Sequence, residues 1–169
     1  MFGKIKLENL AALYTDELKD AYDFEHQVLD ALPEMEEAAV SPQLKEAFRE
    51  HREQTKGQVR RLEQVFSLLG QDAERKTCKG MKGLLSEGSD YIKAKGDDAT
   101  LDAALISAAQ RVEHYEMAVY GTLRTFARAL GHPEQANLLQ QTLEEEAKAD
   151  DRLTRLAESG INVEATVPG

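Results

Sequence analysis

Residues 101–126 read LDAALISAAQRVEHYEMAVYGTLRTF. Apolar side chains recur every three or four positions along this stretch, at Leu101, Leu105, Ala108, Val112, Tyr115, Val119, Leu123 and Phe126. This spacing predicts a long amphipathic helix with one broad buried face. Glu113 and Glu116 stand three positions apart in the same stretch, so they share one side of the predicted helix.

The same periodicity predicts three further long helices. The first covers residues 7–32 and is bent or ended by Pro33. The second begins at Ser41 and Pro42, an N-cap hydroxyl followed by a proline at the first helical position, and runs to Gly70. The fourth follows the junction at residues 131–133 (Gly-His-Pro) and continues to Leu156.

Residues 78–94 carry a weaker helical pattern that glycines interrupt. We therefore expect a short helix inside a long crossover between the second and third long helices. Two helical hairpins joined by a long crossover are typical of ferritin-like proteins. The sequence thus predicts an all-α, ferritin-like four-helix bundle with a short fifth helix, as one domain over residues 1–160. Residues 161–169 have no helical period, and we expect an irregular tail there.

Composition limits the expected partners. The chain has 169 residues, with 31 acidic and 21 basic side chains and a formal net charge of −10. An acidic surface repels phosphate backbones and anionic lipids, so neither nucleic acid nor a membrane is expected as a partner. The first residues lack the apolar stretch of a secretory signal, and we expect a cytoplasmic protein. Cys78 is the single cysteine, which excludes an intramolecular disulfide.

Several ionisable residues fall on or beside the apolar helix faces, namely Glu17, Glu25, His51, Glu113, Glu116, Glu146 and Asp150. Buried carboxylates are costly unless protons, cations or metal ions compensate their charge. Glu25 and His51 lie at similar distances from the loop that joins their helices, so antiparallel packing brings the two level. The same holds for Glu116 and Glu146. Oxygen ligands together with one imidazole favour iron or manganese.

The competing interpretation is that these charges border the apolar faces and stay solvated. For any single glutamate this interpretation is the default. The joint occurrence of Glu25, Glu113, Glu116 and Glu146 on three of the four long helices favours a metal site instead. His51 gains its significance from its place among these carboxylates. Tyrosines, among them Tyr14, Tyr22, Tyr115 and Tyr120, could orient the carboxylates, with core packing as the alternative.

Four segments of the chain carry a family pattern: residues 31–33 (ALP), 51–58 (HREQTKGQ), 78–84 (CKGMKGL) and above all 108–116 (AAQRVEHYE). On these segments nearly the whole chain resembles the bacterial YciE/YciF stress proteins, a branch of the ferritin-like superfamily. The resemblance implies a five-helix bundle related to rubrerythrin and manganese catalase, a homodimer, and iron or manganese as the metal. Glu113 and Glu116 resemble the paired glutamates of the third helix of rubrerythrin, and Glu146 resembles the glutamate of its fourth helix.

The chain departs from the superfamily pattern at two helices. A full di-iron site uses two Glu-x-x-His motifs, whereas the second helix here offers His51 and Gln54, and the fourth offers Glu146 with Ala149 and Asp150. The resemblance implies a glutamate in place of Gln54, so a neutral amide replaces one bridging carboxylate. A single metal ion or a vestigial site is therefore the alternative to a dinuclear site. The candidate metal ligands are Glu25, His51, Gln54, Glu113, Glu116, Glu146 and Asp150.

Two functions are compatible with these observations. The first is a stress-response protein that binds iron or manganese, with the peroxide or iron-oxidation chemistry of a di-iron or di-manganese oxidase or peroxidase. The second is a homodimeric interaction or structural protein of the stress response that keeps the bundle with a metal-free or vestigial site. The carboxylates on the buried faces favour the first function, and the incomplete Glu-x-x-His motifs favour the second.

Overall fold

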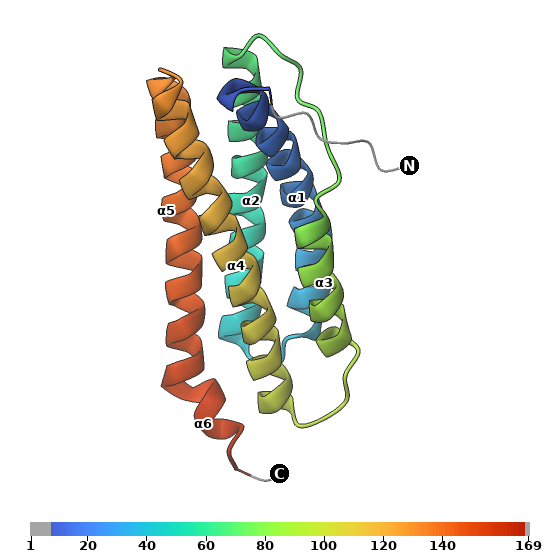
Figure 1. Cartoon of the computed structure of the whole chain (residues 1–169). Helices are drawn as coiled ribbons and strands as arrows, with labels where there is room; N and C mark the ends of the chain where they lie inside the picture. Colours follow the sequence, from blue (N-terminus) through green and yellow to red (C-terminus); the bar gives the residue numbers. More distant parts are fainter. Residues whose placement is uncertain (1–7, 168–169) are drawn as a thin grey trace.

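The computed structural model describes residues 8–167, which form a bundle of four long helices with a shorter helix packed on one side (Figure 1). The long helices are α1 (Leu10–Ala38), α2 (Pro42–Leu68), α4 (Asp98–Ala129) and α5 (Pro133–Leu156). Helix α3 (Lys79–Ile92) belongs to the crossover between α2 and α4. After α5 come a π-helical turn (Ala157–Ile161) and the short helix α6 (Asn162–Glu164).

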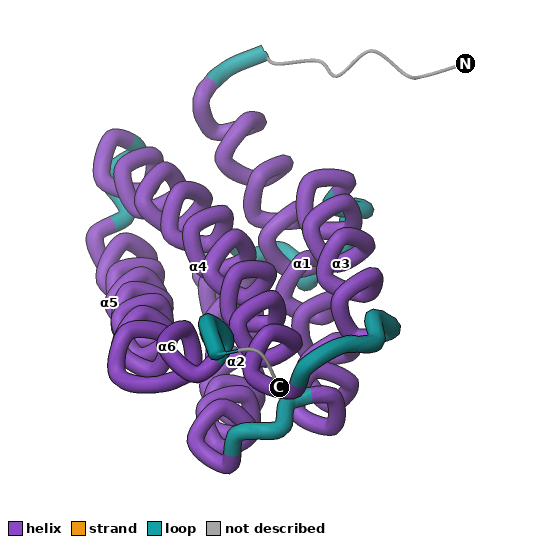
Figure 2. Tube along the Cα trace, turned by 90° about the horizontal axis from the view of Figure 1, so that it is seen from below, coloured by secondary structure: helices purple, strands orange, loops and turns teal. Residues whose placement is uncertain are grey.

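The long helices form two antiparallel hairpins, α1 with α2 and α4 with α5 (Figure 1). The segment after α2 runs back along α1, where the N–H of Lys76 donates to the carbonyl of Lys19 at 3.1 Å. Helix α3 then packs against α1 and α4, and the view along the bundle shows the helices grouped around a common core (Figure 2). This arrangement confirms the predicted all-α, four-helix bundle with a fifth helix in a long crossover.

Local sequence signals explain where the helices begin and end. The side chains of Asn9, Ser41 and Asp97 each accept a hydrogen bond from a backbone N–H in the first turn of α1, α2 and α4. Gly70 and Gly131 follow α2 and α4 with φ angles of 67° and 77°. Glycine adopts this left-handed conformation without the steric penalty that a Cβ would bring.

Helix α1 continues beyond the end that Pro33 suggests. It runs through Pro33 to Ala38, so of the two alternatives for Pro33, a bend or an end of the helix, the end is wrong. A proline cannot donate a helical hydrogen bond. Leu32 and Met35, on either side of it, are both buried. Their packing keeps the chain helical across the missing hydrogen bond.

The segment after α5 is more regular than the sequence pattern suggests. Ile161 and Ala157 are buried, and the chain stays helical as far as Glu164, within the tail expected to be irregular from residue 161. Burial of these apolar side chains offsets the weak helical pattern of this segment. Residues 168–169 of the predicted tail and residues 1–7 of the predicted domain lie outside the described residues.

A buried carboxylate on α1 fixes the crossover beside the bundle. Asp23 accepts a hydrogen bond from the backbone N–H of Cys78 at 2.8 Å and another from Arg75 Nε at 2.9 Å. Gly80 then allows α3 to approach α4, because a Cβ at this position would lie 2.7 Å from the Tyr115 hydroxyl. The crossover is therefore held in one position against the helices that carry the ionisable cluster described below.

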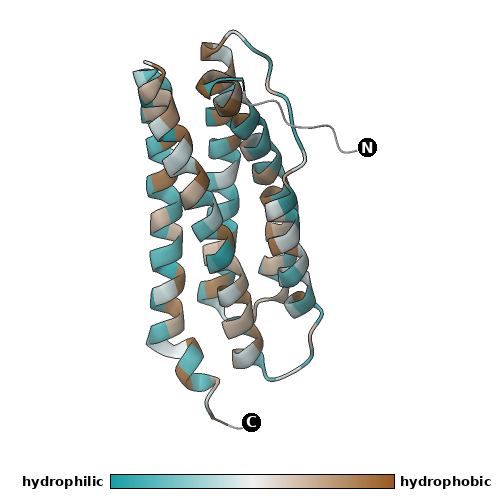
Figure 3. Cartoon of the chain, in the orientation of Figure 1, coloured by the Kyte–Doolittle hydropathy of each residue, from teal (hydrophilic) through white to brown (hydrophobic). Residues whose placement is uncertain are grey.

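The core lies between the four long helices. Its largest fully buried side chains include Tyr14, Leu18, Phe24, Leu62, Phe66, Tyr120, Leu123 and Leu139. Hydrophilic and hydrophobic residues both occur along each long helix, as amphipathic helices require (Figure 3). Within residues 8–167, none of the helices combines the length and apolar character that crossing a bilayer requires.

A second buried carboxylate, which sequence reasoning missed, joins the two hairpins. Asp102 on α4 is 2% exposed and accepts hydrogen bonds from the backbone N–H groups of Val40, at 2.8 Å, and Ser41, at 2.7 Å. Both groups lie in the loop between α1 and α2. Asp102 therefore ties the start of α2 to the first turns of α4.

We predict that Asp102→Ala lowers the free energy of unfolding by about 1–3 kcal/mol, because two backbone N–H groups lose a charged acceptor. Urea denaturation followed by circular dichroism measures this change. Asp30 lies exposed on α1, so Asp30→Ala serves as the control and should change stability by less than about 0.5 kcal/mol. Equal effects of the two substitutions would contradict the role of Asp102.

Candidate metal centre

Four ionisable side chains converge between α2, α4 and α5. His51 comes from α2, Glu113 and Glu116 come from α4, and Glu146 comes from α5. One potential ligand atom from each residue lies within 4.8 Å of those of the others. All four residues are buried, so the cluster is shielded from bulk water. The structure thus contains a buried His/Glu cluster that could hold a metal ion.

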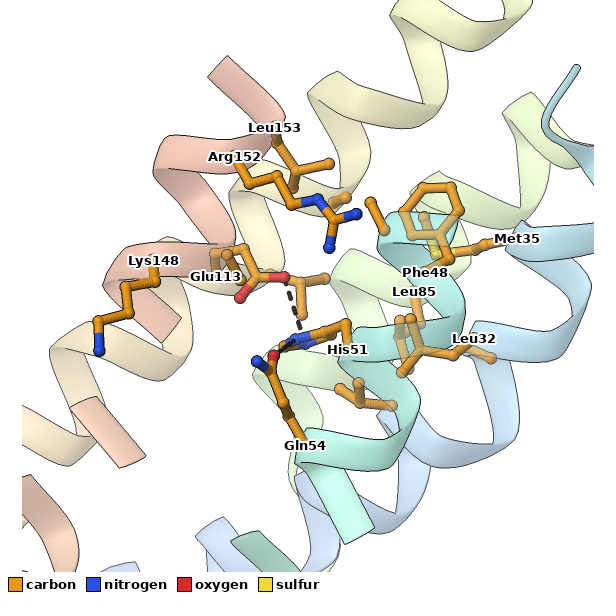
Figure 4. Close-up of a pocket in the computed structure, with 16 residues that line it drawn as sticks. Leu32, Met35, Phe48, His51, Gln54, Leu85, Glu113, Lys148, Arg152 and Leu153 are labelled. Carbon is orange, nitrogen blue, oxygen red and sulfur yellow. Dashed lines mark hydrogen bonds and ion pairs between the residues drawn. The ribbon is translucent and has the colours of Figure 1, made fainter. Parts of the chain in front are cut away.

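His51 points its Nε2 atom at two of the carboxylates. This atom lies 3.4 Å from Glu113 Oε1 and 3.7 Å from Glu146 Oε2, and Figure 4 shows the imidazole directed towards Glu113. On the other side of the ring, Nδ1 makes a long contact of 3.4 Å with Gln54 Oε1. With a proton on Nδ1 shared with Gln54, Nε2 keeps its lone pair for the cluster.

Several buried atoms of the cluster and of the neighbouring Glu25 have no hydrogen-bond partner among the described residues. They are Glu25 Oε2, His51 Nε2, Glu113 Oε2, both carboxylate oxygens of Glu116, and Glu146 Oε2. Buried polar atoms without partners are uncommon because burial removes the water that would otherwise solvate them. A cation placed among these atoms would supply the missing interactions.

Burial raises the pKa of every clustered carboxyl group. Desolvation, with the charges of Asp150 and Glu25, raises the pKa of Glu113 to about 8, although a hydrogen bond with Glu146 acts in the opposite direction. Desolvation also raises the pKa of Glu116 well above its ordinary value, and the charges of Glu146, Glu25 and Glu113 add to this effect. For Glu25 and Glu146 desolvation is likewise the largest cause of a raised pKa. Without a cation, these groups therefore retain protons more strongly than ordinary glutamates do.

Uncharged donors orient two of the carboxylates. The Tyr120 hydroxyl donates to Glu25, and the side-chain amide of Gln58 donates to Glu146. Both donors are fully buried. Neutral donors fix the direction of a carboxylate without cancelling its charge, so the cluster keeps its capacity for a cation.

Within residues 8–167, the arginines and lysines that form ion pairs do so with carboxylates outside the cluster. In this described part of the chain, His51 Nε2 lies near Glu113 and Glu146, and no lysine or arginine forms an ion pair with the four clustered residues. Arg61 lies nearby, but its guanidinium pairs with Glu145 at 2.9 Å. The negative charge of the buried cluster is therefore not neutralised by a neighbouring protein cation.

The candidate ligands fall into two groups. His51, Glu113, Glu116 and Glu146 meet in one cluster, as the helix spacing predicts. Glu25 lies beside this cluster, since its charge raises the pKa of Glu116, and one of its oxygens is held by Tyr120.

Gln54 and Asp150 lie outside the cluster. Gln54 is exposed and contacts His51 rather than the carboxylates. Asp150 accepts a hydrogen bond from Gln110 Nε2 at 3.1 Å and lies 3.3 Å from His114 Nε2, near the surface of α4. Asp150 lies one helical turn beyond Glu146 on α5 and is not one of the four clustered residues, although its charge raises the pKa of Glu113.

Gln58 is the site residue that sequence reasoning missed. It is buried, donates to Glu146 and lies two helical turns after His51. Residues seven positions apart share one face of a helix, so the spacing from His51 is the signal that would have found it. Gln54 was a candidate because it stands three positions after His51, whereas Gln58 lies outside that spacing and carries no charge.

Comparisons with known proteins place the chain in a family. Residues 9–166 match the family described as "Domain of unknown function (DUF892)". Protein YciF of Escherichia coli (strain K12) is 40% identical over 162 residues, which cover 95% of this chain and 98% of YciF.

Solved structures agree with this match. The crystal structure of the E. coli stress protein YciF gives a TM-score of 0.88 at 40% identity, covering 92% of this chain and 98% of that chain. YcfI from Rhodopseudomonas palustris gives a TM-score of 0.87 at 37% identity, with 91% and 98% covered. A protein from Xanthomonas campestris pv. campestris shares the fold at 22% identity, with a TM-score of 0.72 over 94% of this chain and all of that chain. The chain therefore belongs to the DUF892 family and is related to YciF, which confirms the resemblance stated from its sequence.

Proposed function

We propose that this protein binds a divalent iron or manganese ion through His51, Glu113, Glu116 and Glu146, and that it acts in a stress response. The observation that carries the proposal is the convergence of buried, unpartnered ligand atoms on one point between three helices. The stress-response part rests on the relation to YciF, which is described as a stress protein of E. coli.

The donor set fits a hard divalent transition metal. It consists of three carboxylates and one imidazole, all buried. Carboxylate oxygens suit manganese, and a mixture of carboxylate and imidazole suits ferrous iron. A dication would offset two negative charges in a place where no lysine or arginine of the described chain does so.

The same residues favour one tightly held ion over a symmetric pair. Glu25 offers one free oxygen beside the cluster and is available to a second ion. However, Gln58 contributes a neutral amide to Glu146, and Gln54 is exposed. We therefore expect one strong site, with any second ion bound more weakly through Glu25.

Iron or manganese, when bound, would supply one-electron chemistry towards oxygen or a peroxide. The protein residues prepare the site for this chemistry. Burial of the four ligands excludes bulk water, and the low dielectric strengthens each electrostatic interaction. Tyr120 and Gln58 hold their carboxylates in fixed directions, and Gln54 contacts the far side of the His51 ring.

The other expectations drawn from the sequence stay predictions. These are a homodimer, the lack of a nucleic-acid partner and a cytoplasmic location. The net charge of −10 supports the lack of a nucleic-acid partner. The competing function is that of a metal-free protein that acts by binding partners. Measurement of the metal content distinguishes this function from metal binding.

We predict that the tag-free protein retains about one iron or manganese ion per chain after aerobic loading with each metal, as measured by inductively coupled plasma mass spectrometry. Combining Glu116→Ala with Glu146→Ala should lower the affinity for the metal at least about tenfold, as should His51→Ala. His114→Ala is the matched control, because His114 is exposed and pairs with Asp150 outside the cluster. Unchanged metal content in the double variant would refute the site, and no metal in the parent protein would favour partner binding.

We also predict that the metal-free protein loses stability as pH rises. The pKa of Glu113 is raised to about 8 in the folded state, above the ordinary value of 4.5. Between these values the folded state binds more protons than the unfolded state, so the free energy of unfolding falls with increasing pH. Urea denaturation after chelation should give a value lower by at least about 1 kcal/mol at about pH 7.5 than at about pH 5.5.

Two variants test whether the buried cluster causes this pH dependence. Glu116→Gln should reduce it, because both oxygens of Glu116 are buried without a hydrogen-bond partner among the described residues. Glu37→Gln should leave it unchanged, since Glu37 is exposed on α1. If the free energy of unfolding of the metal-free protein instead rises between these two pH values, burial does not destabilise the ionised carboxyl groups.

A further inference from the structure

An apolar cavity of about 130 Å³ adjoins the metal centre and shares His51 and Glu113 with it (Figure 4). Most of its lining is aliphatic or aromatic, and Leu32, Met35 and Phe48 form much of the end that faces α1. The four proposed metal ligands do not need this space. The cavity is therefore a separate feature that requires its own explanation.

Small residues create the space. Ala31, Ala47, Ala109 and Ala149 all line the cavity, and each comes from a different one of the four long helices. Elsewhere the core is filled by large side chains such as Leu123. An apolar cavity of about 150 Å³ in another protein stays dry and binds benzene. The present cavity is thus large enough for an apolar group of about six carbon atoms.

The rim of the cavity carries two cations, both from α5. Arg152 pairs with Glu50 on α2, so its side chain spans the opening between the two helices. Figure 4 shows its guanidinium directed towards the cavity, whereas Lys148 extends away from it. A guanidinium has five N–H donors, and Glu50 contacts Nη1, so further donors are available to an anion.

We propose that this cavity binds a short aliphatic carboxylate, with its chain among Leu32, Met35 and Phe48 and its carboxylate group at Arg152. Lys148, an exposed side chain one helical turn before Arg152 on α5, adds a second positive charge at the rim. Apolar burial supplies affinity for the chain, and a charge-assisted hydrogen bond supplies specificity for the head group.

The bound molecule would lie against His51 and Glu113, and it is therefore the class of substrate that the metal centre would meet. This last assignment rests on the proposed function, whereas binding itself requires no metal ligand. Binding can thus be measured on the metal-free protein, and metal content can be measured on the same samples.

The test is a titration of the full metal-free chain with sodium hexanoate, followed by isothermal calorimetry. We expect saturable binding of one molecule per chain. Hexanol lacks the carboxylate and should bind at least about tenfold more weakly. Lys148→Gln combined with Arg152→Gln should weaken hexanoate binding by a similar factor. Glu50→Gln is the matched control, because it removes the ion pair of Arg152 and keeps the guanidinium charge.

A cavity-filling substitution tests the position of the aliphatic chain. Ala149→Leu should abolish hexanoate binding, and the partial exposure of Ala149 gives the larger side chain room to fit without disrupting the bundle. Circular dichroism checks that the variant folds. Ala31 is also partly exposed, and Ala31→Leu replaces this variant in the test if Ala149→Leu does not fold.

Three results would overturn the proposal: no saturable binding of hexanoate, equal affinity for hexanol and hexanoate, or unchanged affinity in the variant lacking both cations. A protein that binds metal but not hexanoate would keep its proposed function and lose this site. A protein that binds hexanoate but no metal would keep the site and lose the proposed function.

Discussion

Burial of four glutamates in the middle of one bundle is the constraint on which the rest of this structure depends. Glu25, Glu113, Glu116 and Glu146 come from three helices, and all are at most 3% exposed. Desolvation disfavours their ionised forms, so the bundle tolerates them only with protons or a cation. Three features bring these carboxyl groups to one level of the bundle. They are the long helices, the caps that fix the helix ends, and the crossover that sets the order of the helices.

Other buried carboxylates in the same protein show that this lack of partners is particular to the cluster. Asp23 accepts hydrogen bonds from a backbone N–H and from Arg75, and Asp102 accepts two backbone N–H groups. Each connects segments that are distant in sequence and has a structural role. Glu116 has no such partner among the described residues, although it is equally buried. This contrast favours a role for Glu116 as a ligand of a metal ion.

Periodicity and turn residues predicted most of the fold, because each long helix has its own apolar face and its own end signals. Ser41, Gly70 and Gly131 act where their chemistry suggests. The continuation of α1 past Pro33 could not be predicted, since it depends on tertiary packing that overrides a local signal. Asp102 was missed for a similar reason, because its partners lie 61 and 62 residues away in the sequence.

At the site, the candidate residues on the central helix faces meet in one cluster, whereas Gln54 and Asp150 at the borders of those faces lie outside it. His51 and Glu113 meet because their helices pack with those faces inward. Asp150 lies one helical turn after Glu146 on the same helix, but its carboxylate contacts Gln110 and His114 and is not among the residues that meet in the cluster. The cavity depends on what the alanines leave unfilled, and empty space between four helices has no periodic signature in a sequence. An apolar cavity beside a charged cluster also lowers the dielectric around it, so the same packing that admits a ligand strengthens the electrostatic interactions of His51 and Glu113.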